Sequence, residues 1–236
     1  MNHKFITTSE HQFALKTMVG MVLICFGMVA AKAAPMGGAV VAGSASIAGT
    51  PTAVVVNQSS GSAVINWQSF GIGVGESVQF VQPGSNSVAL NRVIGLSPTA
   101  ILGQLSANGK VFVVNPNGVL FGSTASVNVG GLLASTLSIN NDDFMNGEYQ
   151  FTNAGSGHVV NQGNITTAEG GYVAMIGPRV VNNGTIIAPM GTVAMVAANA
   201  ATLDISGDQL INAVIDEAVI NALVENNSSI RADGGL

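Results

Sequence analysis

Charged side chains are scarce in this chain of 236 residues. They make up 8% of the sequence, whereas they account for about 25% of an ordinary soluble domain. The hydrophobic fraction is 47% and the mean hydropathy is +0.47, so the low charge does not indicate intrinsic disorder. The net charge of −5, without any basic run, argues against a nucleic-acid partner. The polar surface must therefore come from Ser, Thr, Asn and Gln.

Cysteine occurs once, as Cys25, inside the apolar stretch 18–31 near the amino end. This stretch is shorter than the roughly 20 apolar residues that a membrane-spanning helix needs. It follows a polar, lysine-containing start and ends in Ala-Lys-Ala, the small-x-small pattern of a secretory signal peptide. We therefore expect a signal peptide over 1–33, cleaved between Ala33 and Ala34; a short membrane anchor is the alternative. Cleavage would leave a mature chain that has no cysteine and cannot form a disulfide.

Aromatic residues are few, at 5%, whereas glycine occurs 30 times, which indicates many short strands joined by tight corners. Residues 63–80, AVINWQSFGIGVGESVQF, place apolar side chains near every second position, which is the period of a β-strand. A short helix is expected over 98–106, because Ser97 is a good N-cap and Pro98 suits the first helical position.

A sequence repeat is the most informative feature of the carboxyl-terminal half. VVNQGNITTAEGGYVAMIG begins at Val159 and VVNNGTIIAPMGTVAMVAA begins at Val180, an offset of 21 residues. A third copy, LVENNSSIRADGG, starts at Leu223, roughly two periods further on. A coil of this length buries its Val and Ile side chains only when it stacks on neighbouring coils. The repeat therefore predicts a parallel β-helix, and crossover handedness predicts that it is right-handed.

Two stretches break the strand pattern. Residues 141–150, NDDFMNGEYQ, are the most polar and are expected to form a loop that leaves the solenoid. Its carboxylates, Asp142, Asp143 and Glu148, could ligate calcium, but solvated carboxylates are the commoner case and we expect no metal. Residues 217–225 show helical spacing and are expected to form a short helix, with a strand as the alternative.

The tetrapeptide Asn-Pro-Asn-Gly interrupts the apolar run KVFVVNPNGVLFG. It consists of Asn115, Pro116, Asn117 and Gly118. Proline suits the second position of a type I turn, asparagine the third and glycine the fourth. The side chain of Asn115 can accept a hydrogen bond from the backbone two residues on, which would close an Asx turn. The β-branched and aromatic flanks predict a tight corner between two strands.

Motifs of enzymes are missing. His158 is the only histidine after the expected cleavage, so no histidine cluster can form a zinc site. GIGVGE at 71–76 lacks the third glycine and the following helix of a dinucleotide fingerprint. The mature basic residues are Arg92, Lys110, Arg179 and Arg231. A β-helix lyase or hydrolase needs clustered Asp, Arg or Lys, so we expect neither an enzyme nor a cofactor.

The segments INWQSFGIGVGESVQFVQP, ALNRVIG, ILGQLSANGKVFVVNPNGVLFG and GGLLASTLSI, in that order, resemble the amino-terminal secretion domain of filamentous-haemagglutinin-type exoproteins. These large adhesins are exported by two-partner secretion. The resemblance runs from about residue 38 to the end and is most specific over 64–138. It implies an amino-terminal cap on the β-helix, with small sheets and a hairpin outside it. It also implies recognition by an outer-membrane β-barrel transporter that carries periplasmic recognition modules.

In this family the Asn-Pro-Asn-Gly motif marks the secretion domain. A second, upstream Asn-Pro-Asn-Leu motif of some members is missing here, which places the chain nearer the high-molecular-weight adhesins. The resemblance implies a secreted or cell-surface protein of a Gram-negative bacterium, which reaches the periplasm through the Sec machinery. We expect residues 34–158 to form the capped secretion domain and 159–236 to form further coils that end in mid-repeat, as the front of a longer protein.

Two other functions stay open at the level of sequence. One is an exported carbohydrate-binding or carbohydrate-active β-helix protein, and the other is a structural cap that recognises no partner. In the preferred hypothesis the domain is a secretion signal that nucleates β-helix folding outside the cell. A host-cell or surface receptor would then be bound through downstream repeats.

Overall fold

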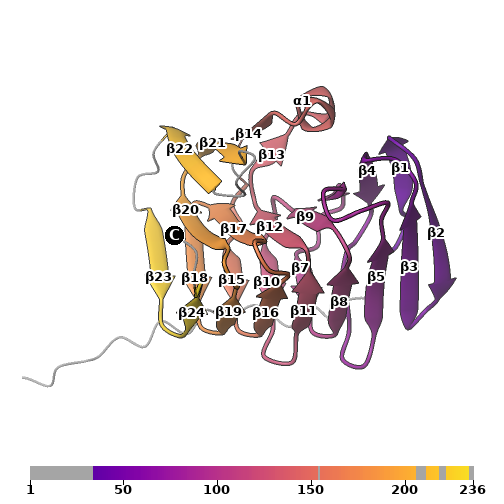
Figure 1. Cartoon of the computed structure of the whole chain (residues 1–236), viewed down its shortest axis with the longest axis horizontal. Helices are drawn as coiled ribbons and strands as arrows, with labels where there is room; N and C mark the ends of the chain where they lie inside the picture. Colours follow the sequence, from indigo (N-terminus) through magenta and orange to yellow (C-terminus); the bar gives the residue numbers. More distant parts are fainter. Residues whose placement is uncertain (1–33, 154, 206–210, 218–221, 234–236) are drawn as a thin grey trace, which may run out of the picture.

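Parallel strands, stacked coil upon coil, form the body of the molecule. The computed structural model describes residues 34–153, 155–205, 211–217 and 222–233. Figure 1 shows the strands side by side along the long axis, from the indigo amino end to the yellow carboxyl end. The all-β parallel helix predicted from the repeat is confirmed by the sheet topology.

Three sheets form the faces of this solenoid within the described residues. The first contains, in spatial order, β1 (Ala39–Ala42), β4 (Ser62–Trp67), β6 (Val88–Val93), β9 (Lys110–Val114), β12 (Gly131–Ser135), β17 (Tyr172–Gly177) and β20 (Thr192–Ala197). The second contains β7 (Thr99–Ile101), β10 (Val119–Phe121), β15 (Val159–Asn161), β18 (Arg179–Asn182) and β23 (Leu223–Asn226). The third contains β2 (Ala45–Thr50), β3 (Ala53–Gln58), β5 (Ser77–Val81), β8 (Gln104–Ala107), β11 (Ser126–Val129), β16 (Asn164–Thr167), β19 (Thr185–Ile187) and β24 (Ile230–Arg231). Coils that have a strand in all three sheets pass through the first, second and third sheet in that order, as β9, β10 and β11 do.

Antiparallel strands close the amino end of the solenoid. β1 pairs antiparallel with β4, and β2 forms an antiparallel hairpin with β3. β3 then pairs in parallel with β5, so the hairpin extends the third sheet. This is the amino-terminal cap that the resemblance implied. A solenoid needs such a cap because its first coil would otherwise expose unpaired backbone groups and apolar core.

The register of the strands confirms the repeat. Val159 lies opposite Val180 and Ile165 opposite Ile186, which is the predicted offset of 21 residues. The third copy stacks directly on the second, because Val180 lies opposite Val224. No coil intervenes between the second and third copies, and β21 (Ala200–Ile205) and β22 (Ile211–Glu217), which lie between them in the sequence, pair with each other outside the solenoid.

A second layer covers the outward face of the first sheet. It contains β13 (Ser138–Ile139), α1 (Asn141–Asn146), β14 (Tyr149–Thr152), β21 (Ala200–Ile205) and β22 (Ile211–Glu217), with the strands antiparallel. Figure 1 shows these elements above β9, β12 and β17. Phe112, Phe144, Phe151 and Tyr172 are fully buried in the shared core. β12 and β17 of the first sheet are consequently buried on both faces, unlike β11 of the third sheet.

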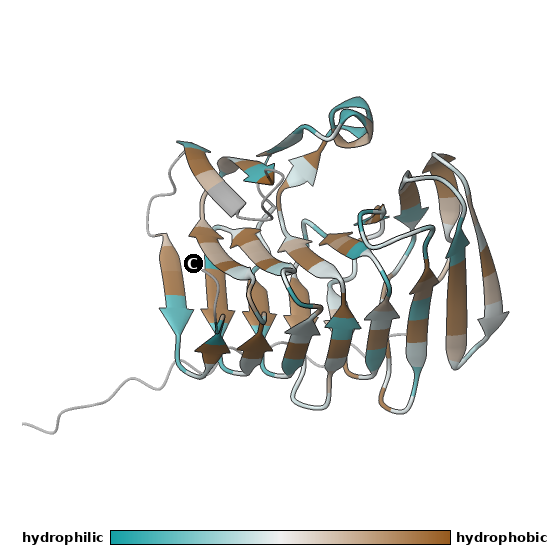
Figure 2. Cartoon of the chain, in the orientation of Figure 1, coloured by the Kyte–Doolittle hydropathy of each residue, from teal (hydrophilic) through white to brown (hydrophobic). Residues whose placement is uncertain are grey.

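Aromatic side chains fill the amino-terminal part of the solenoid interior. Trp67, Phe70 and Phe80 are each about 1% exposed, and the rings of Trp67 and Phe70 meet edge to face at 5.5 Å. The Trp67 Nε1–H donates to Asn91 Oδ1 at 3.0 Å, which satisfies the buried indole. Figure 2 shows apolar and polar bands alternating along the third-sheet strands, as the period of two predicted.

The helix expected over 98–106 is wrong, because β7 and β8 occupy this range. Ile101 and Leu105 are fully buried in the solenoid core, and the Thr99 N–H donates to Gly118 O in the next coil. The N-cap signal at Ser97 is worth only about 1 kcal/mol. The inter-coil hydrogen bonds and the burial of these side chains outweigh it.

The two irregular stretches also differ from their predictions. The polar stretch leaves the solenoid as expected, but it folds as α1 and β14 rather than as a loop. Asn140 caps the helix by accepting from Asp142 N at 2.7 Å, and Gly147 ends it at a φ of 79°. The helix expected over 217–225 is wrong where it can be tested, since β22 reaches Glu217 and β23 begins at Leu223; residues 218–221 lie outside the described residues. Among the described residues, no helix is long and apolar enough to cross a membrane.

Candidate functional site

The Asn-Pro-Asn-Gly corner joins β9 in the first sheet to β10 in the second. The Gly118 N–H donates to Asn115 O at 3.0 Å, and the Asn117 N–H donates to Asn115 Oδ1 at 3.0 Å. The predicted β-turn and Asx turn are therefore both confirmed. Gly118 has a φ of 120°, a region that disfavours residues with a Cβ. Asn117 has no positive φ, as the third position of a type I turn requires.

The Asn115 side chain connects this corner to the preceding coil. It is completely buried, and its Nδ2 donates to Ser97 O and to Thr99 Oγ1, each at 3.0 Å. Asn117 Nδ2 donates to Gly95 O at 3.0 Å. Both asparagines thus hold the segment that leads into β7. The sequence predicted the local hydrogen bond of Asn115 but not these partners, which lie 16 to 22 residues away.

Bare backbone covers the other side of the corner. The Gly157 N–H donates to Pro116 O at 3.0 Å, and the Val119 N–H donates to His158 O at 3.0 Å. A Cβ on Gly157 would lie 2.2 Å from Gly118 N, and one on Gly155 would lie 2.0 Å from Pro116 O. Only glycine can approach the corner this closely. The corner is therefore held between the preceding coil and the following one, and it acts as a structural joint.

An asparagine ladder lies at the opposite edge of the second sheet, at the carboxyl ends of β15, β18 and β23. Asn161 Nδ2 donates to Asn182 Oδ1 at 2.8 Å, and Asn182 Nδ2 donates to Asn226 Oδ1 at 2.7 Å. Asn161 and Asn182 are fully buried, and each Oδ1 also accepts from the backbone two residues on. Stacked amides of this kind satisfy one another from coil to coil. The repeat predicted the alignment of these asparagines, because the copies share their position.

Replacing Asn182 by Ala removes the central rung of this ladder. We expect it to lower the free energy of unfolding by about 2 kcal/mol, because the buried Asn161 amide loses its acceptor and the exposed Asn226 loses its donor. Urea unfolding of the purified chain measures the change. Asn183→Ala is the matched control, since the Asn183 side chain is exposed and, within the described part of the chain, accepts from the Asn227 side chain alone. Equal losses in the two variants would contradict a stabilising ladder.

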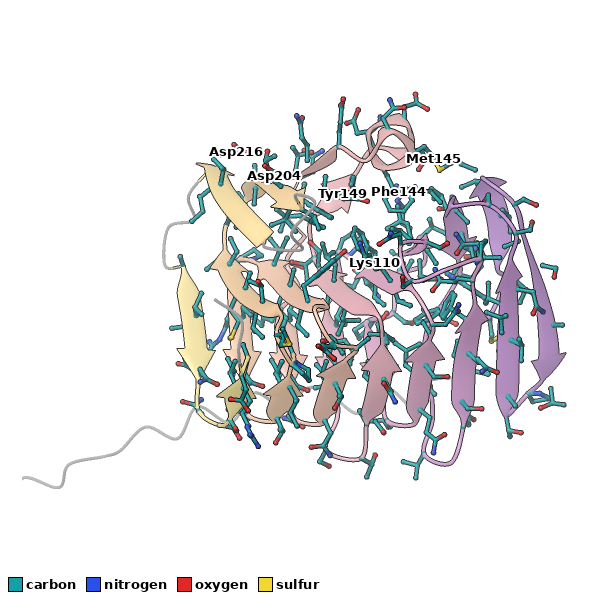
Figure 3. All side chains as sticks on the ribbon, in the orientation of Figure 1. Lys110, Phe144, Met145, Tyr149, Asp204 and Asp216 are labelled. Atoms are coloured by element: carbon teal, nitrogen blue, oxygen red, sulfur yellow. The ribbon has the colours of Figure 1, made fainter. Side chains whose placement is uncertain are left out.

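Basic side chains are dispersed over the structure. Arg92 donates to Asn141 Oδ1 and to Ile139 O, both at 2.6 Å, and burial lowers the pKa of its guanidinium. Lys110 Nζ lies 5.6 Å from the ring centroid of Tyr172, and burial lowers the pKa of its ammonium as well. Figure 3 shows Lys110 beneath the Phe144 and Tyr149 side chains. Arg92 thus links the solenoid to its second layer, whereas the contact of Lys110 with Tyr172 joins two strands of the first sheet.

The other residues considered from the sequence do not assemble into a catalytic or metal site. Asp142 and Asp143 lie in the first turn of α1. Within the described ranges, no three His, Cys, Asp or Glu side chains are placed to share a metal ion. His158 is half-buried, and its Nδ1 has no hydrogen-bond partner among the described residues. Ala33 lies outside the described residues, whereas Ala34 is described and buried.

Comparisons with known proteins give a consistent family. A family model described as the TPS secretion domain matches residues 31–235. The HMW1 secretion domain from Haemophilus influenzae has a TM-score of 0.78 and 32% identity, covering 85% of this chain and 54% of that one. The filamentous hemagglutinin secretion domain has a TM-score of 0.55 and 17% identity, covering 81% of this chain and 73% of that one, which supports the fold alone.

A curated relative agrees with these matches. The heme/hemopexin-binding protein of Haemophilus influenzae is 34% identical over 210 residues, which is 86% of this chain. The chain spans 23% of the length of that relative. Capped coils, the Asn-Pro-Asn-Gly corner and a family match over residues 31–235 all lead to the same conclusion: the chain belongs to the TPS secretion domain family, the secretion domains of exoproteins that Gram-negative bacteria export through the periplasm by two-partner secretion.

Proposed function

We propose that this domain is recognised in the periplasm by an outer-membrane two-partner-secretion transporter and then nucleates the folding of its exoprotein outside the cell. The observation that carries the proposal is the combination of a closed amino end with coils that each build on the one before. β1 and the β2–β3 hairpin close the first coil. Every later coil adds parallel strands to a preformed edge.

Directional growth of this kind suits export from the amino end. The first coils to emerge can close upon their own cap, and each later coil finds a template already in place. The Asn115 joint is one example, since its amide binds Ser97 O and Thr99 Oγ1 of the coil that precedes it. Folding outside the membrane would then oppose backward movement of the chain.

The composition supports passage of an unfolded chain. The single cysteine, Cys25, lies in the proposed signal peptide, so the mature chain cannot form a disulfide-closed loop before transport. With 8% charged residues, the chain brings few charges into a barrel lumen. We propose that the Sec machinery delivers the precursor and that cleavage between Ala33 and Ala34 releases 1–33. Residues 34–158 would form the capped secretion domain and 159–236 its further coils.

The proposed role is non-catalytic. A carbohydrate-binding or carbohydrate-active β-helix is the weaker alternative, because the family match concerns secretion domains. The Haemophilus relative is named for heme/hemopexin binding, and this chain spans 23% of it. We propose that the domain delivers a ligand-binding or receptor-binding exoprotein and does not itself bind that ligand.

Binding to the transporter tests the proposal. The mature chain, kept unfolded in urea and diluted into buffer, is added to the purified transporter held on a sensor surface. We expect saturable binding that a transporter lacking its periplasmic modules does not show. Immobilised polysaccharides serve as the comparison surface. Binding to polysaccharide but not to the transporter would favour the carbohydrate hypothesis instead.

A further inference from the structure

Glu76 is a buried carboxylate near the amino-terminal cap. It is 8% exposed and ends a turn in which the Glu76 N–H donates to Gly73 O and Gly75 has a φ of 78°. Among the described residues, the ion pairs between side chains are Arg179 with Glu225 and Arg231 with Asp233, so Glu76 has no side-chain cation. A buried carboxylate without a cationic partner is costly. Groups other than side-chain cations must therefore stabilise the Glu76 carboxylate.

Two backbone nitrogens bind this carboxylate through the same oxygen. Glu76 Oε2 accepts from Ala34 N at 2.8 Å and from Gly73 N at 2.7 Å. Ala34 is 9% exposed, so the contact lies inside the structure. The following segment is fixed as well, because the Met36 N–H donates to Ser69 O at 2.9 Å. The segment that follows Ala34 thus holds the Ala34 nitrogen against the buried Glu76 carboxylate.

Ala34 also has a backbone conformation that is unfavourable for an internal alanine. Its φ is 68°, in the left-handed region that residues with a Cβ rarely adopt. The φ torsion is defined by the carbonyl carbon of the preceding residue. Cleavage of the Ala33–Ala34 bond removes that carbon from Ala34, and the strain of this torsion ends with it. The conformation is therefore better suited to a chain terminus than to a chain interior.

We propose that the α-ammonium group of Ala34, created by signal-peptide removal, forms a buried ion pair with Glu76 that stabilises the amino-terminal cap. The proposal rests on the cleavage between Ala33 and Ala34 put forward above. Hydrolysis adds one water: the hydroxyl goes to the Ala33 carbonyl carbon, which becomes a carboxylate, and a proton goes to the Ala34 nitrogen. The free amine, with an ordinary pKa of about 8, takes up a further proton at neutral pH.

Processing and cap stability are coupled in this arrangement. In the precursor, Ala34 offers Glu76 a neutral amide N–H, whereas in the mature chain it offers a full positive charge. Charge-assisted hydrogen bonds are roughly twice as strong as neutral ones. The cap is therefore less stable before cleavage than after it. The precursor accordingly stays easier to unfold until the signal peptide has been removed.

A double-mutant cycle tests the ion pair in protein purified from the periplasm of cells without a transporter. One change inserts Gly-Ser between Ala33 and Ala34, which keeps the Ala-Lys-Ala site and moves the terminal charge by two residues. The other is Glu76→Gln. We expect the insertion to lower the folding equilibrium constant at least about tenfold when Glu76 is present, and less than about twofold in the Glu76→Gln background. Equal effects in both backgrounds would overturn the proposal.

Amine labelling of the native wild-type chain gives a second readout that needs no variant. The mature chain has two amines, the α-amine of Ala34 and Nζ of Lys110. We expect intact mass to show a chain that begins at Ala34, with an α-amine that an acylating reagent modifies at least about tenfold more slowly in the folded state than in urea. A different terminus, or equal rates in both states, would refute the ion pair. A chain that fails to bind a transporter would leave both results unchanged, so this inference and the proposed function can fail separately.

Discussion

The double variant Asn115→Ala/Asn117→Ala is expected to lose about 4 kcal/mol of unfolding free energy and to accumulate in the periplasm. The two side chains make the hydrogen bonds to Ser97 O, Thr99 Oγ1 and Gly95 O, in addition to those within the turn. Each bond contributes about 1 kcal/mol net, and the buried acceptors would stay unpaired. Urea unfolding and the fraction of protein in the culture medium measure the two effects.

Asn128→Ala is the matched control for this variant. Asn128 lies on β11 and is exposed. Its replacement is expected to change the unfolding free energy by less than about 0.5 kcal/mol and to leave secretion unchanged. If the double variant were secreted as well as this control while being equally stable, the corner would have no part in folding or export.

Gly157→Ala is expected to destabilise the chain by about 3 kcal/mol or more. The added Cβ would lie 2.2 Å from Gly118 N and 2.3 Å from the Asn117 carbonyl carbon. Both atoms belong to backbone, so neither a rotamer change nor a small side-chain movement can make room. The corner or the segment over it must move, and the hydrogen bond from Gly157 N to Pro116 O is then lost. The midpoint of urea unfolding reports the loss.

Gly84→Ala provides the comparison. A Cβ at Gly84 meets no atom within 4 Å, and its φ lies outside the region unfavourable to alanine. We expect it to be neutral or slightly stabilising, because alanine restricts the unfolded chain. A similar midpoint for the two variants would mean that close backbone contact over the corner does not stabilise the fold.

The repeat and the corner could be predicted because their signals are local or periodic. The offset between Val159 and Val180 equals the length of one coil, so the sequence directly indicated which strands lie opposite each other. The Asn115 turn depends on residues that adjoin it in the chain. In both cases the physical interaction acts over a distance that the sequence pattern itself displays.

Other features depend on contacts between distant residues and gave no such signal. The capping preference of Ser97 predicted a helix, but the hydrogen bond from Thr99 N to Gly118 O requires the next coil to be in place. The function of Gly157 likewise emerges only when its backbone lies over the corner. The short helix α1 could have been found from Asn140 and Gly147, which are its N-cap and C-cap. Its polar composition led to the loop prediction instead.

The apolar side chains on the outward face of the first sheet could be interpreted only with the structure. Residues of the first sheet, such as Leu133 and Ala174, are fully buried although they alternate with residues that face the solenoid interior. They are covered by the second layer, in which Phe144 and Phe151 are fully buried. Continuous apolar runs in β12 and β17 reflect burial on both faces, as in other covered parallel sheets.

Export in the presence and absence of a transporter tests the central claim most directly. The chain is expressed in Gram-negative cells together with an outer-membrane two-partner-secretion transporter. In a parallel strain it is expressed with a variant of the same transporter that lacks the periplasmic modules. Immunoblots of the medium and the periplasm give the distribution of the mature chain. We predict that most of it is in the medium only with the intact transporter, and that it accumulates in the periplasm otherwise. The same distribution in both strains would contradict its function as a two-partner secretion domain.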